Sequence, residues 1–160
     1  MIIKELKLHN FGVYAGTNVF DFKADKPIVL IGGLNGRGKT TFLEAVLLSL
    51  YGKNSFAYSE GSGQTYGQYL KSYVNVADGT KDTYVELTFC MNANGTDEYR
   101  IKREWNGNGA RTSESVTVHK DGEYNQFLTD NWAMFMENVL PSALSSFFFF
   151  DGEKIAMLAG

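Results

Sequence analysis

The chain has almost no cysteine and almost no proline. Its 160 residues include one cysteine, Cys90, and two prolines. A single thiol cannot form an internal disulfide, so we expect a protein of a reducing compartment, the cytoplasm. A chain of this length buries roughly 70% of its extended-chain surface on folding, which allows a core without a disulfide or metal.

Long apolar runs and an excess of positive charge are also missing. No run approaches the roughly 20 apolar residues that a membrane-spanning helix needs, and the N-terminus alternates charged and apolar residues, unlike a signal peptide. We therefore expect no membrane partner. The formal net charge of −3 excludes a strongly basic nucleic-acid coat, so any contact with DNA has to be local.

Glycine, by contrast, is abundant, with 17 residues against an average share of about 7%. The segment Gly33–Thr40 reads Gly-Leu-Asn-Gly-Arg-Gly-Lys-Thr and matches the phosphate-binding pattern G-x-x-x-x-G-K-[ST]. It follows a continuous apolar run, Ile28–Ile31, typical of a buried strand, and precedes apolar residues at helical spacing over Thr40–Tyr51. Gly52 stands where that helix is expected to end.

This pattern predicts a site for a nucleoside triphosphate. The glycines let successive backbone N–H groups form a concave nest for an anion, which the positive end of the helix dipole reinforces. Lys39 is expected at the β- and γ-phosphates, and the Thr40 hydroxyl at a Mg²⁺ ion. No Asn-Lys-x-Asp guanine motif is present, so ATP is the expected nucleotide. The predicted nucleotide-binding residues are Gly33, Asn35, Gly36, Arg37, Gly38, Lys39, Thr40 and Thr41.

Period-two alternation predicts antiparallel strand pairs around this unit, and so an α/β fold. The pairs are Ile2–Leu8 with Val19–Phe22, Thr83–Met91 with Glu98–Trp105, and Ser115–His119 with Tyr124–Leu128. Helices are predicted near Tyr69–Val74 and over Asn131–Val139, the latter capped by Asp130 and broken by Pro141. The four phenylalanines Phe147–Phe150 predict a buried strand.

The residues after that run allow two interpretations. Taken alone, Phe147–Phe150 followed by Asp151 is typical of a Walker B strand, whose carboxylate holds the Mg²⁺ shell, with Glu153 nearby as a possible base. The chain is then a self-contained small P-loop NTPase or kinase. The other interpretation depends on a family resemblance.

The segments Leu6–Gly12, Phe20–Phe22 and Ile31–Ala45 resemble the first lobe of SMC and SbcC-type ATPase heads. More narrowly, Phe147–Ile155, with the sequence Phe-Phe-Phe-Phe-Asp-Gly-Glu-Lys-Ile, resembles the DndD family, SMC-like ATPases of bacterial DNA sulfur modification (phosphorothioation). The fold that this implies is the N-terminal lobe of an ABC-type ATPase, with antiparallel hairpins flanking the P-loop core. Residues 1–160 are then one nucleotide-binding lobe that stops before a coiled-coil arm.

The resemblance also implies roles for single residues. Asn35 fits the asparagine that helps contact the γ-phosphate in these heads, and Asp151 stands where they place the Q-loop glutamine, so that a metal contact from Asp151 follows under both interpretations. The main catalytic base is expected beyond residue 160, and Glu153 is expected to start a helix. Gly12 departs from the family, since related heads often have an arginine there, beside the nucleotide.

Four functions follow from these patterns. The first is an ATP-binding half-head that hydrolyses poorly alone, dimerises head to head with ATP, and serves DNA sulfur modification with the other proteins of that pathway. The second is a DNA repair ATPase of the SMC/SbcC type, and the third is the self-contained NTPase. The fourth is a nucleotide-switched module that binds DNA or protein. Arg100 and Lys102, on the most basic predicted strand, are the candidate DNA contacts.

Overall fold

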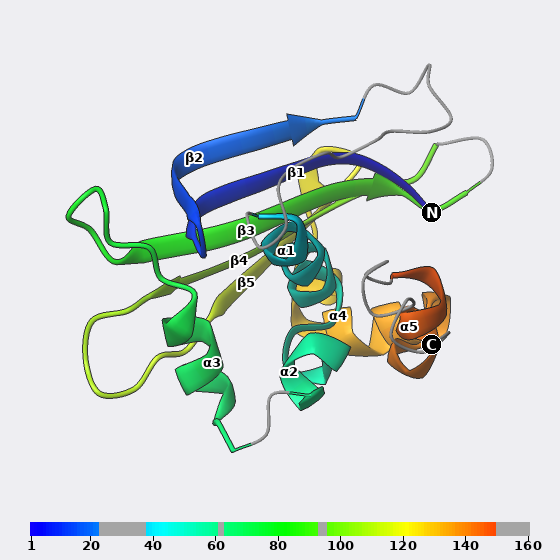
Figure 1. The fold of residues 1–160 in the computed structure, drawn as a ribbon. Helices are drawn as coiled ribbons and strands as arrows, with labels where there is room; N and C mark the ends of the chain where they lie inside the picture. The colour runs from blue at the N-terminus through cyan, green and yellow to red at the C-terminus, as the bar shows by residue number, and fades with distance from the viewer. Residues whose placement is uncertain (23–37, 61–62, 93–95, 150–160) are drawn as a thin grey trace, which may run out of the picture.

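The computed structural model describes residues 1–22, 38–60, 63–92 and 96–149, and its largest element is a six-stranded antiparallel sheet of order β2-β1-β3-β4-β5-β6 (Figure 1). The strands are β1 (Ile2–Phe11), β2 (Tyr14–Asp21), β3 (Asp82–Cys90), β4 (Glu98–Asn106), β5 (Ser115–Lys120) and β6 (Glu123–Tyr124). The helices are α1 (Lys39–Tyr51), α2 (Phe56–Glu60), α3 (Tyr66–Ser72), α4 (Gln126–Val139) and α5 (Ser145–Phe148). None of the helices in these described ranges is long and apolar enough to cross a membrane.

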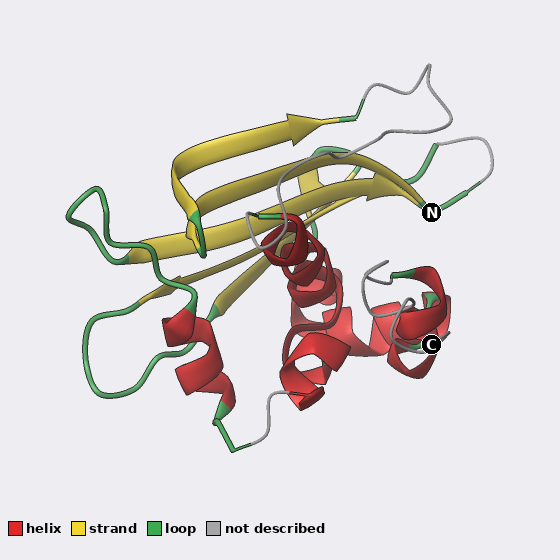
Figure 2. Ribbon diagram, viewed as in Figure 1, coloured by secondary structure: helices red, strands yellow, loops and turns green. Residues whose placement is uncertain are grey.

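The predicted α/β class is confirmed, and the sheet shows why alternation was informative. The helices lie on one side of the sheet (Figure 2), and one side chain in two on each inner strand points into the core between them. A row of fully buried, paired side chains crosses four strands: Leu6, Leu87, Ile101 and Val118. The adjacent row on the other face is Lys7, Glu86, Lys102 and Thr117.

Helix α1 forms the centre of the core. Its residues from Ala45 to Tyr51 are all buried, because β3 and β4 cover one side of the helix and α4 covers another. Two hydrogen bonds tie its last turn to the α4 region: the Trp132 indole donates to the Leu50 carbonyl (2.9 Å), and the Tyr51 hydroxyl donates to the Leu140 carbonyl (3.0 Å). The predicted helix over Thr40–Tyr51 is thus confirmed.

Arg103 is a buried cation inside this core, although it belongs to the most basic strand. Its side chain is 6% exposed and forms an ion pair of 2.7 Å with Glu114, while its Nε donates to the Ser49 carbonyl of α1 (3.1 Å). Glu114 also accepts a hydrogen bond from the Tyr66 hydroxyl (2.8 Å). One guanidinium therefore connects β4, the last turns of α1 and the segment before β5.

The segment after β5 corrects two predictions. Asn125 caps α4, with its side chain accepting from the Leu128 N–H, so residues 126–128 are helical and not part of a hairpin strand. Asp130 therefore lies inside the helix and is not its cap. The backbone bends at Asn131 (φ −123°, ψ 21°), one residue later, and the helix ends before Pro141 as predicted.

The buried strand predicted at Phe147–Phe150 is wrong for the residues that are described. Ser145–Phe148 form the short helix α5, which follows a 3₁₀ turn after Pro141, and Phe147 and Phe148 are 73% and 61% exposed. The Ser145 hydroxyl donates to the Ser142 carbonyl (2.6 Å), which stabilises this helical turn locally. Phe150 and the predicted strand Ile28–Ile31 lie outside the described residues.

The other predicted elements are found close to their expected places. The first strand pair is β1 with β2, and the second hairpin is β3 with β4 in continuous register from Asp82 to Cys90. Cys90 is buried. Helix α3 begins three residues before the predicted Tyr69 because Thr65 and Gln68 form a capping box.

The ion pair and hydrogen bonds of Arg103 and Glu114 predict that substitutions of two neighbouring β4 residues differ in their effect on stability. Arg103→Met keeps an apolar stem but leaves the Glu114 carboxylate buried without its cation, and we expect a loss of about 3 kcal/mol in the free energy of unfolding. Lys102→Ala is the matched control on the uncovered face, where loss of the exposed Glu104 pair costs less than about 1 kcal/mol. Urea denaturation measures both, and equal losses would contradict the assignment.

Candidate nucleotide-binding site

Four of the predicted nucleotide-binding residues are described by the structure: Gly38, Lys39, Thr40 and Thr41. They form the start of α1. The other predicted contacts, Gly33, Asn35, Gly36 and Arg37, lie outside the described residues, and so do Asp151 and Glu153. The described part of the site is therefore the first turn of α1, together with the elements that pack against it.

The N-terminus of α1 has the geometry that an anion site needs. Gly38 precedes the helix with φ 100° and ψ −17°, a conformation that favours glycine, and its carbonyl accepts the first helical hydrogen bond from Phe42 (2.8 Å). The N–H groups of the first turn therefore point back along the helix axis, toward the preceding loop. Thr40 is exposed, and the first turn contains no acidic residue to oppose a phosphate.

Tyr14, a residue that the sequence did not single out, contacts this helix start. Its hydroxyl donates to the Gly38 carbonyl (2.9 Å), and its ring makes an edge-to-face contact with Phe20 on the same strand. Phe20 in turn packs edge to face against Phe42 of α1. The β1–β2 hairpin thus packs against the start of α1, and no local signal predicts this contact, since Tyr14 and Gly38 are 24 residues apart.

Gly12, in the turn of that hairpin, lies against Thr41. The residue has φ +59°, and a Cβ built on it would lie 2.6 Å from the Thr41 Cγ2 atom, closer than any real contact. Its N–H donates to the Tyr73 carbonyl (2.6 Å) and its carbonyl accepts from the Asn75 side chain (2.8 Å). The arginine that the family resemblance implies at this position would therefore require the Thr41 side chain to move.

Tyr73 links the same turn to α1. Its ring stacks on Phe11, with 4.5 Å between ring centroids, and its hydroxyl donates to the Glu44 carboxylate, one turn after Thr40. Burial raises the pKa of Tyr73, and the hydrogen bond to Glu44 raises it further. The phenol is therefore a neutral donor at physiological pH, and Glu44 faces the segment after α3.

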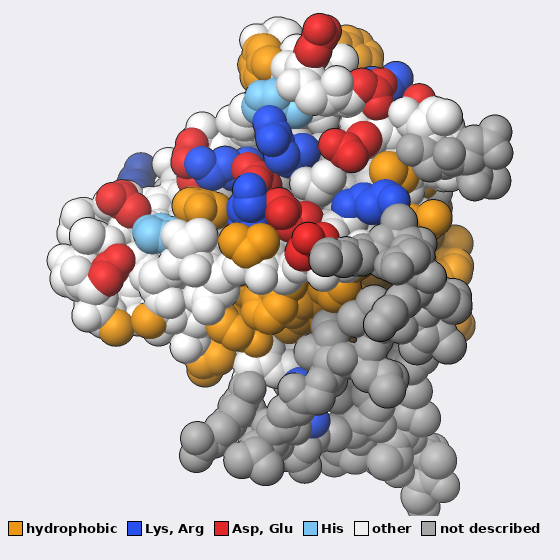
Figure 3. All heavy atoms as spheres, turned by 90° about the horizontal axis from the view of Figure 1, so that it is seen from above, with side chains coloured by type: hydrophobic (Ala, Val, Ile, Leu, Met, Phe, Trp, Pro, Cys, Tyr) orange, Lys and Arg blue, Asp and Glu red, His pale blue; other side chains and the backbone are white. Residues whose placement is uncertain are grey.

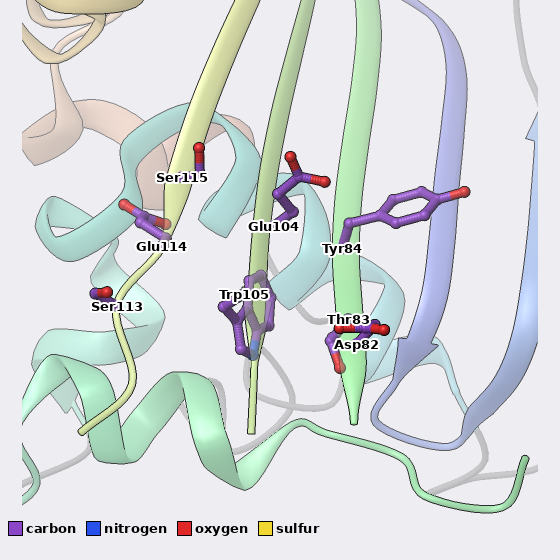
Figure 4. A pocket seen from close by; sticks show the side chains of 8 residues that line it. All are labelled: Asp82, Thr83, Tyr84, Glu104, Trp105, Ser113, Glu114 and Ser115. Atoms are coloured by element: carbon purple, nitrogen blue, oxygen red, sulfur yellow. The ribbon is translucent and has the colours of Figure 1, made fainter. Parts of the chain in front are cut away.

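Two further pockets lie away from the start of α1. One, of about 350 Å³, is lined by residues of β3, β4 and the start of β5 and includes the carboxylates of Asp82, Glu104 and Glu114 (Figure 4). The other, of about 450 Å³, lies beside Tyr51 and Lys53, at the opposite end of α1 from Gly38. Neither pocket includes a residue of the predicted phosphate-binding motif among its lining residues.

The candidate DNA contacts Arg100 and Lys102 both lie on the uncovered face of the sheet. Lys102 pairs with Glu104 (2.9 Å) and lies 4.5 Å from the centre of the Tyr84 ring, so its charge is already partnered. The same face carries the Lys7 pairs with Glu5 and Glu86. Basic and acidic side chains are interspersed there and form no continuous basic stripe (Figure 3). A DNA contact at Arg100 and Lys102 stays a prediction.

The described residues contain no group of three or more His, Cys, Asp or Glu side chains that would hold a metal ion. Of the predicted Mg²⁺ ligands, only Thr40 is described, with its residue exposed at the helix start. A single hydroxyl is consistent with Mg²⁺, which keeps several waters and takes substrate phosphates as ligands rather than a protein cage. The described donors thus fit an ion that arrives with a nucleotide.

Comparison with known families decides the class of protein. A family model described as an AAA domain matches residues 5–157. The chain belongs to this AAA domain family. This match includes the predicted phosphate loop, and it agrees with the predicted P-loop α/β fold.

Two curated relatives of this AAA domain are similar in sequence. "DNA double-strand break repair Rad50 ATPase" of Methanocaldococcus jannaschii is 35% identical over 106 residues, which are 66% of this chain and 9% of the relative. The SbcC component of the SbcCD nuclease of Treponema pallidum is 50% identical over 98 residues, which are 61% of this chain and 8% of the relative. The chain therefore spans about a tenth of the length of these relatives. The predicted resemblance to SbcC-type ATPase heads is confirmed, and the narrower DndD resemblance stays a prediction.

A solved structure, the "SMC head domain from Thermotoga maritima", is also similar to this AAA domain. It aligns with a TM-score of 0.44 and 18% sequence identity, over 79% of this chain and 39% of that chain.

The close approach of Gly12 to Thr41 predicts that two glycine-to-alanine substitutions in the same hairpin differ in how much stability they cost. Gly16→Ala, at φ +64° with no atom within 4 Å of the added Cβ, costs only the backbone strain of about 1 kcal/mol. Gly12→Ala has the same strain and also displaces Thr41, so we expect a further loss of about 1 to 3 kcal/mol. Thermal and urea unfolding of the two variants measure the difference, and equal stabilities would show that Thr41 moves freely.

Proposed function

We propose that this chain is the ATP-binding lobe of an SMC-like ATPase head that acts on DNA. The observation that supports the proposal is the phosphate-binding sequence pattern that ends in the first turn of α1, where Thr40 is exposed, in a chain of the AAA domain family. The names of the similar proteins, a double-strand break repair ATPase and a nuclease component, support DNA as the substrate of the whole protein.

In this proposal the nucleotide is held by its phosphates. The N–H groups of residues 39–41 and the positive end of the α1 dipole face the triphosphate, and Lys39 places its ammonium against the β- and γ-phosphates. The Thr40 hydroxyl would be a ligand of a Mg²⁺ ion bound together with the nucleotide. Asn35 contacts the γ-phosphate, and Asp151 adds a metal or water contact in place of the Q-loop glutamine. When bound, Mg²⁺ would neutralise part of the negative charge that develops on the phosphates.

The lobe is one half of a head, and the proposal extends to how it is completed. A second lobe supplies Walker B and the catalytic base, and a second head supplies the signature motif across an ATP-dependent homodimer. Residues 1–160 alone therefore bind ATP and hydrolyse it poorly. The exposed, helical Phe147 and Phe148 support this proposal over the self-contained NTPase, because a Walker B carboxylate follows a buried strand.

The process that the head drives has two candidates, each favoured by one observation. The 50% identity to the SbcC component of a nuclease over 98 residues favours DNA end processing or repair. The sequence Phe147–Ile155, which resembles the DndD family, favours DNA sulfur modification, with the other sulfur-modification proteins as partners. The two candidates share the ATP-binding site and differ in the fate of the DNA.

Lys39→Ala tests the nucleotide site. Loss of a charge-assisted contact to phosphate is worth about 1.5 to 3 kcal/mol, so we expect ATP affinity to fall about 10- to 100-fold in calorimetric titrations with Mg²⁺. Lys53→Ala is the matched control, since Lys53 follows the opposite end of the same helix. ATP affinity that is unchanged in Lys39→Ala would refute the proposed site.

Deletion of the gene in the source organism separates the two processes. If the head serves sulfur modification, phosphorothioate-linked dinucleotides disappear from digests of the genomic DNA, as measured by mass spectrometry, and a wild-type copy restores them while Lys39→Ala does not. Unchanged phosphorothioate content, or none in the parent strain, together with increased sensitivity to double-strand breaks, would assign the protein to DNA repair.

A further inference from the structure

We propose that Tyr14 is a positioning residue for the phosphate loop: its hydroxyl holds the Gly38 carbonyl so that the peptide N–H beyond it faces the nucleotide phosphates. The inference rests on the proposed nucleotide site and assigns to the β1–β2 hairpin a role in forming it.

The Gly38 carbonyl has both of its acceptor positions filled. It accepts the Phe42 N–H at 2.8 Å and the Tyr14 hydroxyl at 2.9 Å. The carbonyl of Gly38 and the N–H of Lys39 belong to one planar peptide unit and point in opposite directions. Fixing the oxygen on the side of the helix and of Tyr14 therefore directs the Lys39 N–H the opposite way, out from the N-terminal end of α1.

This peptide unit needs an external constraint. Gly38 has no Cβ to restrict its backbone torsions (φ 100°, ψ −17°), so the hydrogen bonds from Phe42 and from Tyr14 are what oppose rotation of this unit. Rotation would turn a carbonyl oxygen, with its partial negative charge, toward the phosphates and remove one donor from the nest. The Tyr14 hydrogen bond opposes that rotation before the nucleotide arrives, and such preorganisation improves affinity without a new ligand contact.

Tyr14 is itself held in place from several sides. Its ring contacts Phe20, and the preceding turn is anchored through Gly12 by the Tyr73 carbonyl and the Asn75 side chain. Burial raises the pKa of Tyr14, so the phenol is protonated and able to donate throughout the neutral range. The fit at Gly38 is tight, because a Cβ on that residue would lie 2.5 Å from the Tyr14 hydroxyl oxygen.

Tyr14→Phe removes the hydroxyl and keeps the ring. Affinities for ATP, GTP and inorganic tripolyphosphate, each with Mg²⁺, are measured by calorimetry on the full chain, with the unfolding midpoint recorded alongside. Because one hydrogen bond contributes about 0.5 to 1.5 kcal/mol, we expect all three affinities to fall by the same factor, about 3- to 10-fold. Tyr124→Phe is the matched control: it loses an exposed hydroxyl bond to Gln126 (2.8 Å) and is expected to bind like the wild type.

The three ligands separate positioning from the alternatives. A loss confined to ATP would mean that Tyr14 contacts the base, and affinities equal to those of the wild type would mean that the hydroxyl has no role; each result overturns the inference. If the wild type binds none of the three ligands and Lys39→Ala changes nothing, the proposed nucleotide site itself fails.

A second variant covers the case in which Tyr14→Phe folds poorly. Asn75→Ala frees the Gly12 carbonyl and loosens the turn that carries Tyr14. We expect a loss of about 2- to 3-fold for all three ligands. Where Tyr14→Phe does fold, the double variant is expected to bind more tightly than the product of the single losses predicts, because both residues act through one hydrogen bond. Independent, multiplicative losses, or no loss in Asn75→Ala, would contradict the positioning role.

Discussion

The burial of helix α1 is the constraint on which the other features of this fold depend. Seven consecutive residues, Ala45–Tyr51, are buried, so the helix has no solvent-facing side over its last two turns. A helix that is apolar all round has to be enclosed, and the sheet, α4 and the segment after α1 enclose it. Accessible surface on α1 is confined to residues 39–44, of which only Thr40 is exposed. The fold thereby presents the positive end of one helix dipole, with Thr40 exposed, and little else of α1.

The two ends of α1 are fixed by different chemistry. At the C-terminal end, Arg103 and Glu114 form a buried ion pair that also reaches the Ser49 carbonyl. Such a pair contributes little net stability compared with apolar residues, but any arrangement that separates the charges is strongly disfavoured, so it favours one packing of β4 on α1. At the N-terminal end, two of the contacts are between neutral groups: Tyr14 with Gly38, and Gly12 with Thr41. Neutral contacts suit a site that has to receive a highly charged ligand.

Elements with a regular local pattern could be predicted from the sequence, and elements decided by distant partners could not. The alternation of apolar and polar residues on β3 and β4 was sufficient to predict both strands. In β4 it also puts Arg103 on the same face as the buried Tyr99 and Ile101, but a charged residue is not expected to be buried, so its position was not recognised from the sequence. The phenylalanine run was misread because hydrophobicity alone does not distinguish a strand from a helical turn after Pro141. Asn125 and Asp130 are both acceptable caps, and only the packing of Leu128 and Trp132 decides between them.

For the site, the helix start was predictable because its spacing is a local motif, whereas Tyr14 was not, because its partner is fixed only when the hairpin folds over α1. The contact of Gly12 with Thr41 also couples two substitutions. Since a side chain at position 12 and the Thr41 methyl compete for one volume, the two positions are not free to change separately. A residue larger than glycine in the turn of the first hairpin requires a smaller residue or another rotamer at position 41, in the first turns of α1.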